Sequence, residues 1–250
     1  MSFWPPPHTG ALSLTFDDGM PSHLETVVPE LDRRGLRGTF YLNPRGDEDE
    51  NSPSSWRKQL EAWLPAAWAG HEMGNHSLTH PCSLNIPMDW APNLLEMTLA
   101  DLEQDLQEAQ RRISSAFPAQ KATSFAYPCY ETSLGRGLHR LSYVPLVARL
   151  FAAGRARGEL ANDPHFCDLH CLSSWNVERQ TSAFLIGLAE LAAAQGRWGI
   201  MAFHGINEGH LPVSGVDFSE FLDHLARRQE HIWVAPVAEV AVYIQEQLTG

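Results

Sequence analysis

The feature that most constrains the fold is the alternation of short apolar runs with amphipathic segments. The apolar runs predict β-strands at 11–16 (ALSLTF), 38–42 (GTFYL), 123–128 (TSFAYP), 198–205 (WGIMAFHG) and 231–236 (HIWVAP). Apolar residues at helical spacing predict helices at 23–35, 56–70, 93–117, 182–196, 218–229 and 237–248, with a kink or break at Pro65 in the second. This alternation predicts an α/β fold with a parallel sheet, and its length of 250 residues suits a (β/α) barrel. We expect one catalytic domain over residues 1–250, with 134–177 as its least readable segment.

The charge and the hydropathy of the chain exclude several classes of partner. The formal net charge is −12, from 18 basic and 30 acidic residues, and Lys and Arg form no dense run. We therefore expect no nucleic-acid binding. No stretch is apolar and long enough to span a bilayer, so we expect no membrane partner. The first residues, MSFWPPPHTG, do not resemble a secretory signal, which predicts a cytoplasmic protein unless an upstream signal was trimmed. The sequence does not indicate the oligomeric state.

The four cysteines do not form a CxxC pair, and we expect them to be reduced and buried. Cys167 and Cys171 are four positions apart, which would suit half of a metal site, but a second half is missing. Cys82 closely follows the segment HSLTH (76–80), and Cys129 directly follows FAYP (125–128). We expect both to face the cleft of the barrel.

Polar residues follow two of the predicted strands and one shorter segment, where barrels of this kind collect their chemistry. Asp17 and Asp18 follow the run 11–16, and His204 follows GIMAF (199–203). His76 follows GHEMGN (70–75), a short segment that could be a strand end. His76 and His80 stand at i and i+4, which on one turn of helix or in a tight helical loop would place both imidazoles on one side. Such a pair is more often a surface feature, but two imidazoles and one carboxylate also form a common three-ligand set for a catalytic divalent ion.

The two adjacent acids then take different roles. If Asp18 binds the metal, Asp17 is free to act as a general base. His204 is the candidate acid for the leaving group, with a structural core histidine as the alternative.

Four segments stand in a fixed order along most of the chain: TFDDG (15–19), HSLTH (76–80), FAYP (125–128) and FHGI (203–206). They resemble the successive motifs of the polysaccharide deacetylase family, carbohydrate esterase family 4. The resemblance implies a distorted (β/α) barrel and a hydrolase that removes acetyl groups from N- or O-acetylated carbohydrate. It also implies a divalent metal ion, Zn²⁺ first, with Co²⁺, Mn²⁺ or Ni²⁺ as alternatives.

The same resemblance implies a role for each matching residue. Asp17 matches the catalytic base and His204 the catalytic acid. The metal ligands of the family are matched by Asp18, His76 and His80. The turn that contains Tyr127 and Cys129 would contact the substrate and supply a backbone N–H to the oxyanion.

The chain departs from the family pattern in two places. The third motif usually carries an arginine that holds the base, and Ala126 stands there instead. Arg155 is our candidate substitute. The fourth motif usually contains an acid and a tryptophan, and no segment of this chain matches it clearly. Asp168 is the candidate acid and Trp175 the candidate tryptophan, as a wall of the pocket. Core or surface packing is the alternative for each.

Three other functions remain open. The first is a metal-dependent amidase or cyclic imide hydrolase that acts on a small non-sugar substrate. The second is an iron oxygenase, because two histidines and one aspartate also describe its metal site, although that set usually sits on a β-jelly roll. The third is a degenerate sugar-binding module, against which the presence of all five matching residues argues.

Overall fold

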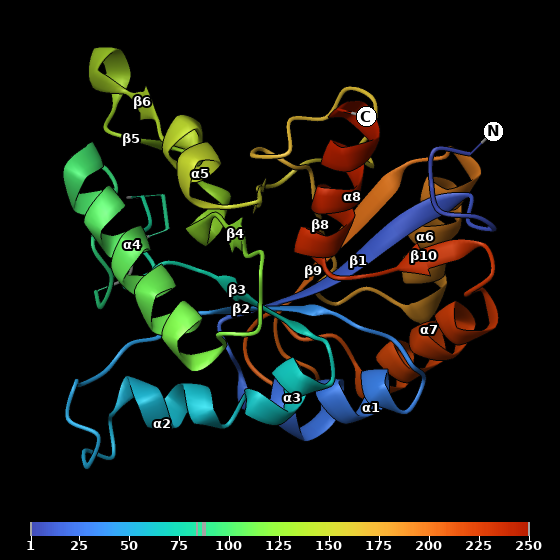
Figure 1. Ribbon diagram of the computed structural model, residues 1–250, viewed down its shortest axis with the longest axis horizontal. Coiled ribbons are helices and arrows are strands. Elements are labelled where there is room, and N and C mark those ends of the chain that lie inside the picture. Colours follow the sequence, from blue (N-terminus) through green and yellow to red (C-terminus); the bar gives the residue numbers. More distant parts are fainter. Residues whose placement is uncertain (1, 84, 87–88, 250) are drawn as a thin grey trace.

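A parallel sheet runs through the computed structural model, which describes residues 2–83, 85–86 and 89–249. Within these residues the strand order is β7-β4-β3-β2-β1-β9-β8, and β10 also pairs with β1 (Figure 1). The strands are β1 (Gly10–Asp17), β2 (Thr39–Leu42), β3 (Glu72–Asn75), β4 (Ser124–Ala126), β7 (Ala153–Arg155), β8 (Trp175–Asn176), β9 (Trp198–Phe203) and β10 (Ile232–Val234). The prediction of an α/β fold with a parallel sheet is confirmed. Strands from the first and last parts of the chain share this sheet, and the single domain over 1–250 stays a prediction.

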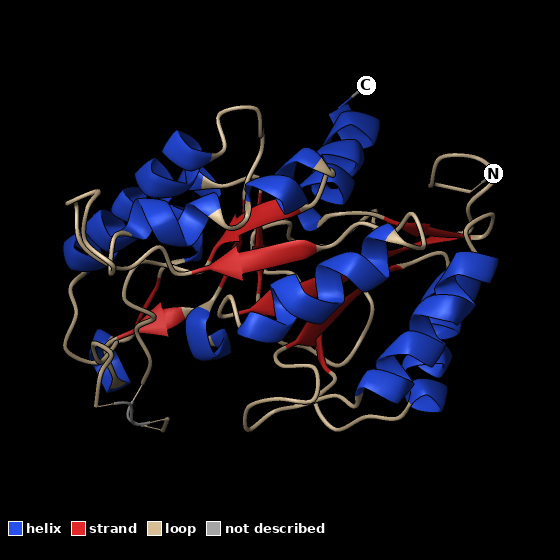
Figure 2. Cartoon of the chain, turned by 90° about the horizontal axis from the view of Figure 1, so that it is seen from below, coloured by secondary structure: helices blue, strands red, loops and turns tan. Residues whose placement is uncertain are grey.

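Helices enclose the strands on both sides (Figure 2). They are α1 (Val28–Asp32), which continues a π-helical turn at His23–Val27, α2 (Trp56–Glu61), α3 (Leu64–Trp68), α4 (Leu99–Ala116), α5 (Val144–Leu150), α6 (Ser182–Ala194), α7 (Gly215–Arg227) and α8 (Val237–Thr249). A small antiparallel ladder pairs β5 (Ser133–Leu134) with β6 (Leu141–Ser142). Among the residues described, no helix combines the length and the apolar character needed to cross a bilayer.

Two predicted helices have other bounds in the structure, and each difference has a local cause. The predicted helix 56–70 divides into α2 and α3, and Pro65 occupies the first turn of α3, where its missing N–H costs no hydrogen bond. The predicted helix 93–117 begins only at Leu99. Thr98 forms a capping box there with Asp101, which satisfies free N–H groups of the first turn.

Successive side chains of β1 face opposite sides of the sheet. Leu12, Leu14 and Phe16 lie in the apolar core that the outer helices cover. Ser13 and Thr15 are also buried, and their hydroxyls donate to the backbone carbonyls of Ala235 and Met201. The same alternation places Asp17 on the polar side with them. The interior of the barrel therefore carries polar groups that lead to the carboxyl ends of the strands.

Glu72 at the start of β3 connects the sheet with α8. Its buried carboxylate accepts hydrogen bonds from the Thr39 hydroxyl at 2.9 Å, the Ser124 N–H and hydroxyl at 2.7 Å each, and the Ala238 N–H at 3.0 Å. Ala238 lies in the first turn of α8, where N–H groups lack partners within the helix. Burial raises the pKa of Glu72, and these four donors act against that rise. One carboxylate thus joins β2, β3, β4 and α8.

We expect Glu72→Ala to lower the free energy of unfolding by about 3 kcal/mol or more, because it leaves several buried donors without an acceptor. Urea denaturation followed by circular dichroism measures the change. Glu61→Ala, an exposed position at the end of α2, is the matched control and should leave the midpoint unchanged. A Glu72→Ala protein as stable as the wild type would contradict the role of this carboxylate.

Candidate active site

The polar residues predicted to meet do so at the carboxyl ends of neighbouring strands. Asp17 ends β1 and Asp18 follows it, while His76 directly follows β3 and His204 directly follows β9. Phe16 of β1 pairs with Phe203 of β9, so Asp17 and His204 stand at the same level of the sheet. Parallel strands carry these side chains to one edge.

Asp18, His76 and His80 form a group that fits a divalent cation. The Asp18 Oδ1 atom lies 3.7 Å from His76 Nε2 and 3.5 Å from His80 Nε2, and one ligand atom from each residue lies within 4.8 Å of the others. Ligand bonds of 2.0–2.2 Å at tetrahedral angles separate such atoms by about 3.4 Å. A small contraction of the group would therefore bring all three atoms to zinc distance.

The two imidazoles are held in the form that a metal requires. His76 Nδ1 lies 2.8 Å from the Ala126 carbonyl, a contact in which Nδ1–H donates and Nε2 keeps its lone pair. Burial lowers the pKa of His76, and burial together with the neighbouring His76 lowers the pKa of His80 to about 4. Both rings are neutral at pH 7, as metal ligands must be.

Of the two conformations that the spacing allows for 76–80, the structure has a loop and not a turn of helix, and side chains fix its shape. Ser77 and His80 have φ values of 63° and 56°, in the left-handed region. Asp105 of α4 accepts hydrogen bonds from the Leu78 N–H at 2.8 Å and the Thr79 N–H at 3.1 Å. The Ser77 hydroxyl accepts one from the His80 N–H at 2.8 Å. The loop still places both imidazoles on one side, as a helical turn would, because the ring centres of His76 and His80 lie 4.8 Å apart.

Residues other than glycine with positive φ gather around this group. Within the described residues there are seven, and five belong to the segments that form the site: Asp18, Ser77, His80, Cys129 and Tyr130. Each such conformation costs of the order of 1 kcal/mol or more and persists where the surroundings enforce it. At Asp18 the left-handed turn redirects the chain directly after Asp17, so both carboxylates reach the same edge.

Arg155 holds the carboxylate of Asp17. Its Nη2 atom donates to Asp17 Oδ2 at 2.6 Å, and both side chains are buried. Arg155 ends β7 and is the register partner of Ala126 on β4. Its guanidinium therefore comes from the strand beside the one that lacks the motif arginine. The rings of Tyr41 and Tyr130 lie beneath it, at 5.0 and 5.3 Å.

The charge of Arg155 decides the ionisation of Asp17. Burial alone would raise the pKa of this carboxyl, but the Arg155 guanidinium acts against burial and lowers the pKa below its ordinary value. Asp17 is thus ionised at neutral pH. Its second oxygen, Oδ1, is buried and has no hydrogen-bond partner within the described chain.

His204 is fixed through its backbone. Its carbonyl accepts a hydrogen bond at 2.8 Å from Nε2 of the buried His23, while its own Nδ1 is buried and unpartnered among the described residues. Sequence reasoning missed His23. It also missed Tyr130 and Glu178, which each have a buried oxygen without a hydrogen-bond partner in the described structure. Tyr130 lies near enough to Arg155, Asp17 and Glu178 to interact with them electrostatically. Glu178 lies two positions beyond Asn176 of β8. Because residues two apart in an extended segment face the same side, this spacing could have indicated that Glu178 faces the site.

A family model described as polysaccharide deacetylase matches residues 5–134 of the chain. The chain belongs to the polysaccharide deacetylase family. The matched part contains the metal-binding candidates and Asp17 but ends before Arg155 and His204. No curated protein matches the chain at a significant level.

Solved structures of the family share the distorted barrel, which confirms the predicted fold. A putative polysaccharide deacetylase from Mycobacterium smegmatis has 16% identity and a TM-score of 0.65, covering 98% of this chain and 93% of its own. The peptidoglycan deacetylase PdaC from Bacillus subtilis has 14% identity and a TM-score of 0.56, covering 98% and 96%. A family pseudoenzyme from Bacillus anthracis has 17% identity and a TM-score of 0.57, covering 95% and 66%.

Tyr127 and Trp175, two of the candidates taken from the family pattern, lie in the core. The Tyr127 side chain is buried among apolar residues beside α5, and its hydroxyl donates to the His170 carbonyl at 2.6 Å. The Trp175 ring packs in the outer core and lies against Gly199, so it does not form the wall of the cleft. Asp168, the candidate acid of the fourth motif, is exposed and accepts a hydrogen bond from the His170 N–H.

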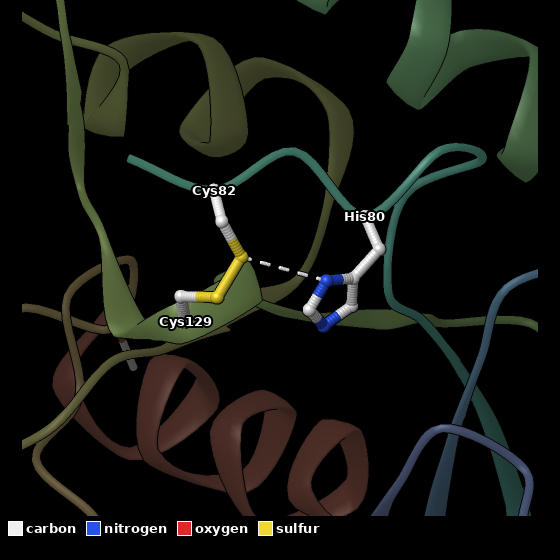
Figure 3. A group of neighbouring side chains, drawn as sticks. All are labelled: His80, Cys82 and Cys129. Carbon is white, nitrogen blue, oxygen red and sulfur yellow. Dashed lines mark hydrogen bonds between the residues drawn. A yellow bond between two sulfur atoms is a disulfide. The ribbon is translucent and has the colours of Figure 1, made fainter. Parts of the chain in front are cut away.

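Cys82 and Cys129 form a disulfide, so the expectation that all four cysteines are reduced is wrong. Their Cα atoms lie 5.8 Å apart, within the usual range for a disulfide. The Cys82 sulfur lies 3.6 Å from His80 Nδ1, beside the metal-binding candidates (Figure 3). Cys167 and Cys171 are free, half-buried and exposed respectively.

A pocket of about 770 Å³ lies away from this site, and its lining is more apolar than the candidate active site. Trp68, Phe117, Trp233 and Tyr243 are among its lining residues, and none of the predicted site residues lines it. Volume alone would favour this pocket, but the convergent ionisable groups lie at the carboxyl ends of the strands. Those groups decide the assignment of the candidate active site.

We expect Asp105→Ala to weaken Zn²⁺ binding about 10- to 100-fold, because Asp105 positions the loop that carries His80. Competition with a chromophoric chelator measures the affinity, and circular dichroism checks the fold. Asp101→Ala changes the exposed cap of the same helix and should leave Zn²⁺ affinity as it is. A folded Asp105→Ala protein with wild-type affinity would show that the loop holds its shape without this carboxylate.

Proposed function

We propose that the protein is a metal-dependent hydrolase that removes acetyl groups from N- or O-acetylated carbohydrate. The observation that carries the proposal is the position of Asp17: a buried, ionised carboxylate, held at one oxygen by Arg155 and unpartnered at the other, next to Asp18, His76 and His80. A sugar-binding module has no need of this combination. Membership of the polysaccharide deacetylase family supports acetylated carbohydrate as the substrate class.

Asp18, His76 and His80 would hold the metal ion. Two imidazoles and a carboxylate suit Zn²⁺, and Co²⁺, Mn²⁺ or Ni²⁺ accept the same donors. When bound, such an ion lowers the pKa of a water molecule and polarises an acetyl carbonyl. The neutral state of both imidazoles and the contact of His76 with the Ala126 carbonyl support this assignment.

Asp17 and His204 divide the proton transfers. Asp17 accepts a proton from the attacking water at Oδ1, and Arg155 keeps Oδ2 occupied, so that the carboxylate stays ionised and fixed in direction. His204 protonates the leaving amine or alcohol. Its unpartnered Nδ1 and its backbone contact with His23 support a fixed ring that can donate a proton. The N–H groups of the turn at Cys129 would stabilise the oxyanion.

The family includes a pseudoenzyme, so activity requires a direct test. We expect acetate release from acetylated chito- or xylo-oligosaccharides, lost when the protein is stripped of metal and recovered when Zn²⁺, Co²⁺ or Mn²⁺ is added back. Asp17→Asn should abolish release and retain the metal, because the amide cannot accept the proton. Acetate assays and elemental analysis measure the two quantities.

Two outcomes would change the proposal. No acetate under any condition, with release of product from small amides or cyclic imides, would replace the substrate class by that of an amidase. Loss of metal in Asp17→Asn would overturn the division of roles between Asp17 and Asp18.

We expect Arg155→Met to lower kcat about 100-fold or more while the metal content is retained, because a misdirected base loses most of its contribution to proton transfer. Steady-state kinetics and elemental analysis test this. Arg157→Met, two positions along the chain and exposed, is the matched control and should keep wild-type kcat. Unchanged kcat in a folded Arg155→Met protein would show that Asp17 does not need the guanidinium.

A further inference from the structure

His80, Cys82 and Cys129 form a second group of ligand atoms beside the proposed metal site. One donor atom from each lies within 4.8 Å of the others. His80 presents its two nitrogens to different neighbours: Nε2 lies 3.5 Å from Asp18 Oδ1, and Nδ1 lies 3.6 Å from the Cys82 sulfur. Figure 3 shows the Nδ1 edge of the ring turned toward the disulfide.

The separation of nitrogen and sulfur is the one that a tetrahedral zinc site requires. A Zn–S bond of about 2.3 Å and a Zn–N bond of about 2.0–2.1 Å at a tetrahedral angle place the two ligand atoms about 3.6 Å apart. The observed distance from His80 Nδ1 to Cys82 Sγ is 3.6 Å. The two sulfurs would have to part to about 3.8 Å. Breaking the S–S bond allows this through side-chain rotation alone.

Hydrogen bonds hold the two cysteines in place independently of the disulfide. Cys82 N–H donates to the Pro92 carbonyl at 3.1 Å, and the Cys82 carbonyl accepts from the Leu94 N–H at 2.8 Å. The Glu131 N–H closes the turn around Cys129 by donating to the Pro128 carbonyl at 3.1 Å. The Ser83 hydroxyl donates to Glu131 Oε1 at 3.0 Å and joins the same two segments. Both sulfurs should therefore remain near His80 after reduction.

We propose that reduction of the Cys82–Cys129 disulfide creates a thiolate-rich binding site for a divalent cation of the zinc type, formed by both sulfurs and His80 Nδ1. A dithiol supplies two electrons and two protons and is itself oxidised to a disulfide, while the S–S bond gives two thiols. Metal binding then releases the two thiol protons. A neutral imidazole has one lone pair, so His80 serves one group at a time: binding through Nδ1 at the two sulfurs puts the ring proton on Nε2 and removes His80 from the ligands of the ion next to Asp18. The inference does not depend on the proposed hydrolase activity.

Co²⁺ absorption tests the proposal, because thiolate ligands give an intense charge-transfer band and carboxylate and imidazole ligands do not. For this experiment the protein is prepared with Cys167→Ser and Cys171→Ser, which removes its two free thiols. Two samples are stripped of metal and titrated with Co²⁺. In one the Cys82–Cys129 disulfide is intact, and in the other a dithiol has reduced it and has then been removed under argon. We expect the charge-transfer band only in the reduced protein, and its loss when Cys82→Ser or Cys129→Ser is added.

Three results would overturn the proposal, and a fourth would remove His80 from it. The first is a reduced, folded protein without the band, with circular dichroism as the check on folding. The second is a band that survives in the protein with both Cys82→Ser and Cys129→Ser. The third is loss of the native fold on reduction, because the three donors are then no longer held together. An unchanged Co²⁺ affinity of the reduced protein after His80→Ala would remove His80 from the site.

Discussion

The buried ion pair between Asp17 and Arg155 is the contact on which the arrangement of the site depends. Transferring a single charge into a protein interior costs several kcal/mol, and a partner at 2.6 Å offsets that cost. The compensation here is incomplete, since Arg155 Nε and Nη1 and Asp17 Oδ1 have no hydrogen-bond partners within the described residues. A cluster of unpaired buried polar atoms is expected where a polar ligand or water completes the bonding.

Strand register explains how the chain keeps an arginine at this place without an arginine in the motif. Ala126 and Arg155 are paired residues of β4 and β7, and their side chains leave the sheet on the same side at the same level. A long side chain on one strand can then occupy the space that its neighbour leaves. The backbone carbonyl of Ala126 lies 2.8 Å from His76 Nδ1. The same register thus serves the base and one metal-ligand candidate.

The sequence was informative wherever a periodic pattern led into a polar strand end. Asp17, Asp18, His76 and His204 could be placed at one edge because parallel strands of regular pattern precede them. The spacing of His76 and His80 left a turn of helix and a tight loop both open, since nothing local reveals that Asp105, far along the chain, shapes a loop there. For Trp175 the sequence left both a pocket wall and core packing open, because β8 has only two residues, too few to show which side chain faces inward. The disulfide joins residues 47 positions apart, and spacing alone does not determine pairing.

The contact between Glu72 and α8 has a consequence for the order in which the chain folds. The two partners of the hydrogen bond, Glu72 and Ala238, are 166 positions apart, and Arg155 and Asp17 are 138 apart. Neither contact can form until its later partner has left the ribosome. Asp18, His76 and His80 are all synthesised before Arg155, His204 and α8. During synthesis the set of metal-ligand candidates is therefore complete before the arginine beside the base and the last helix that contacts Glu72 exist.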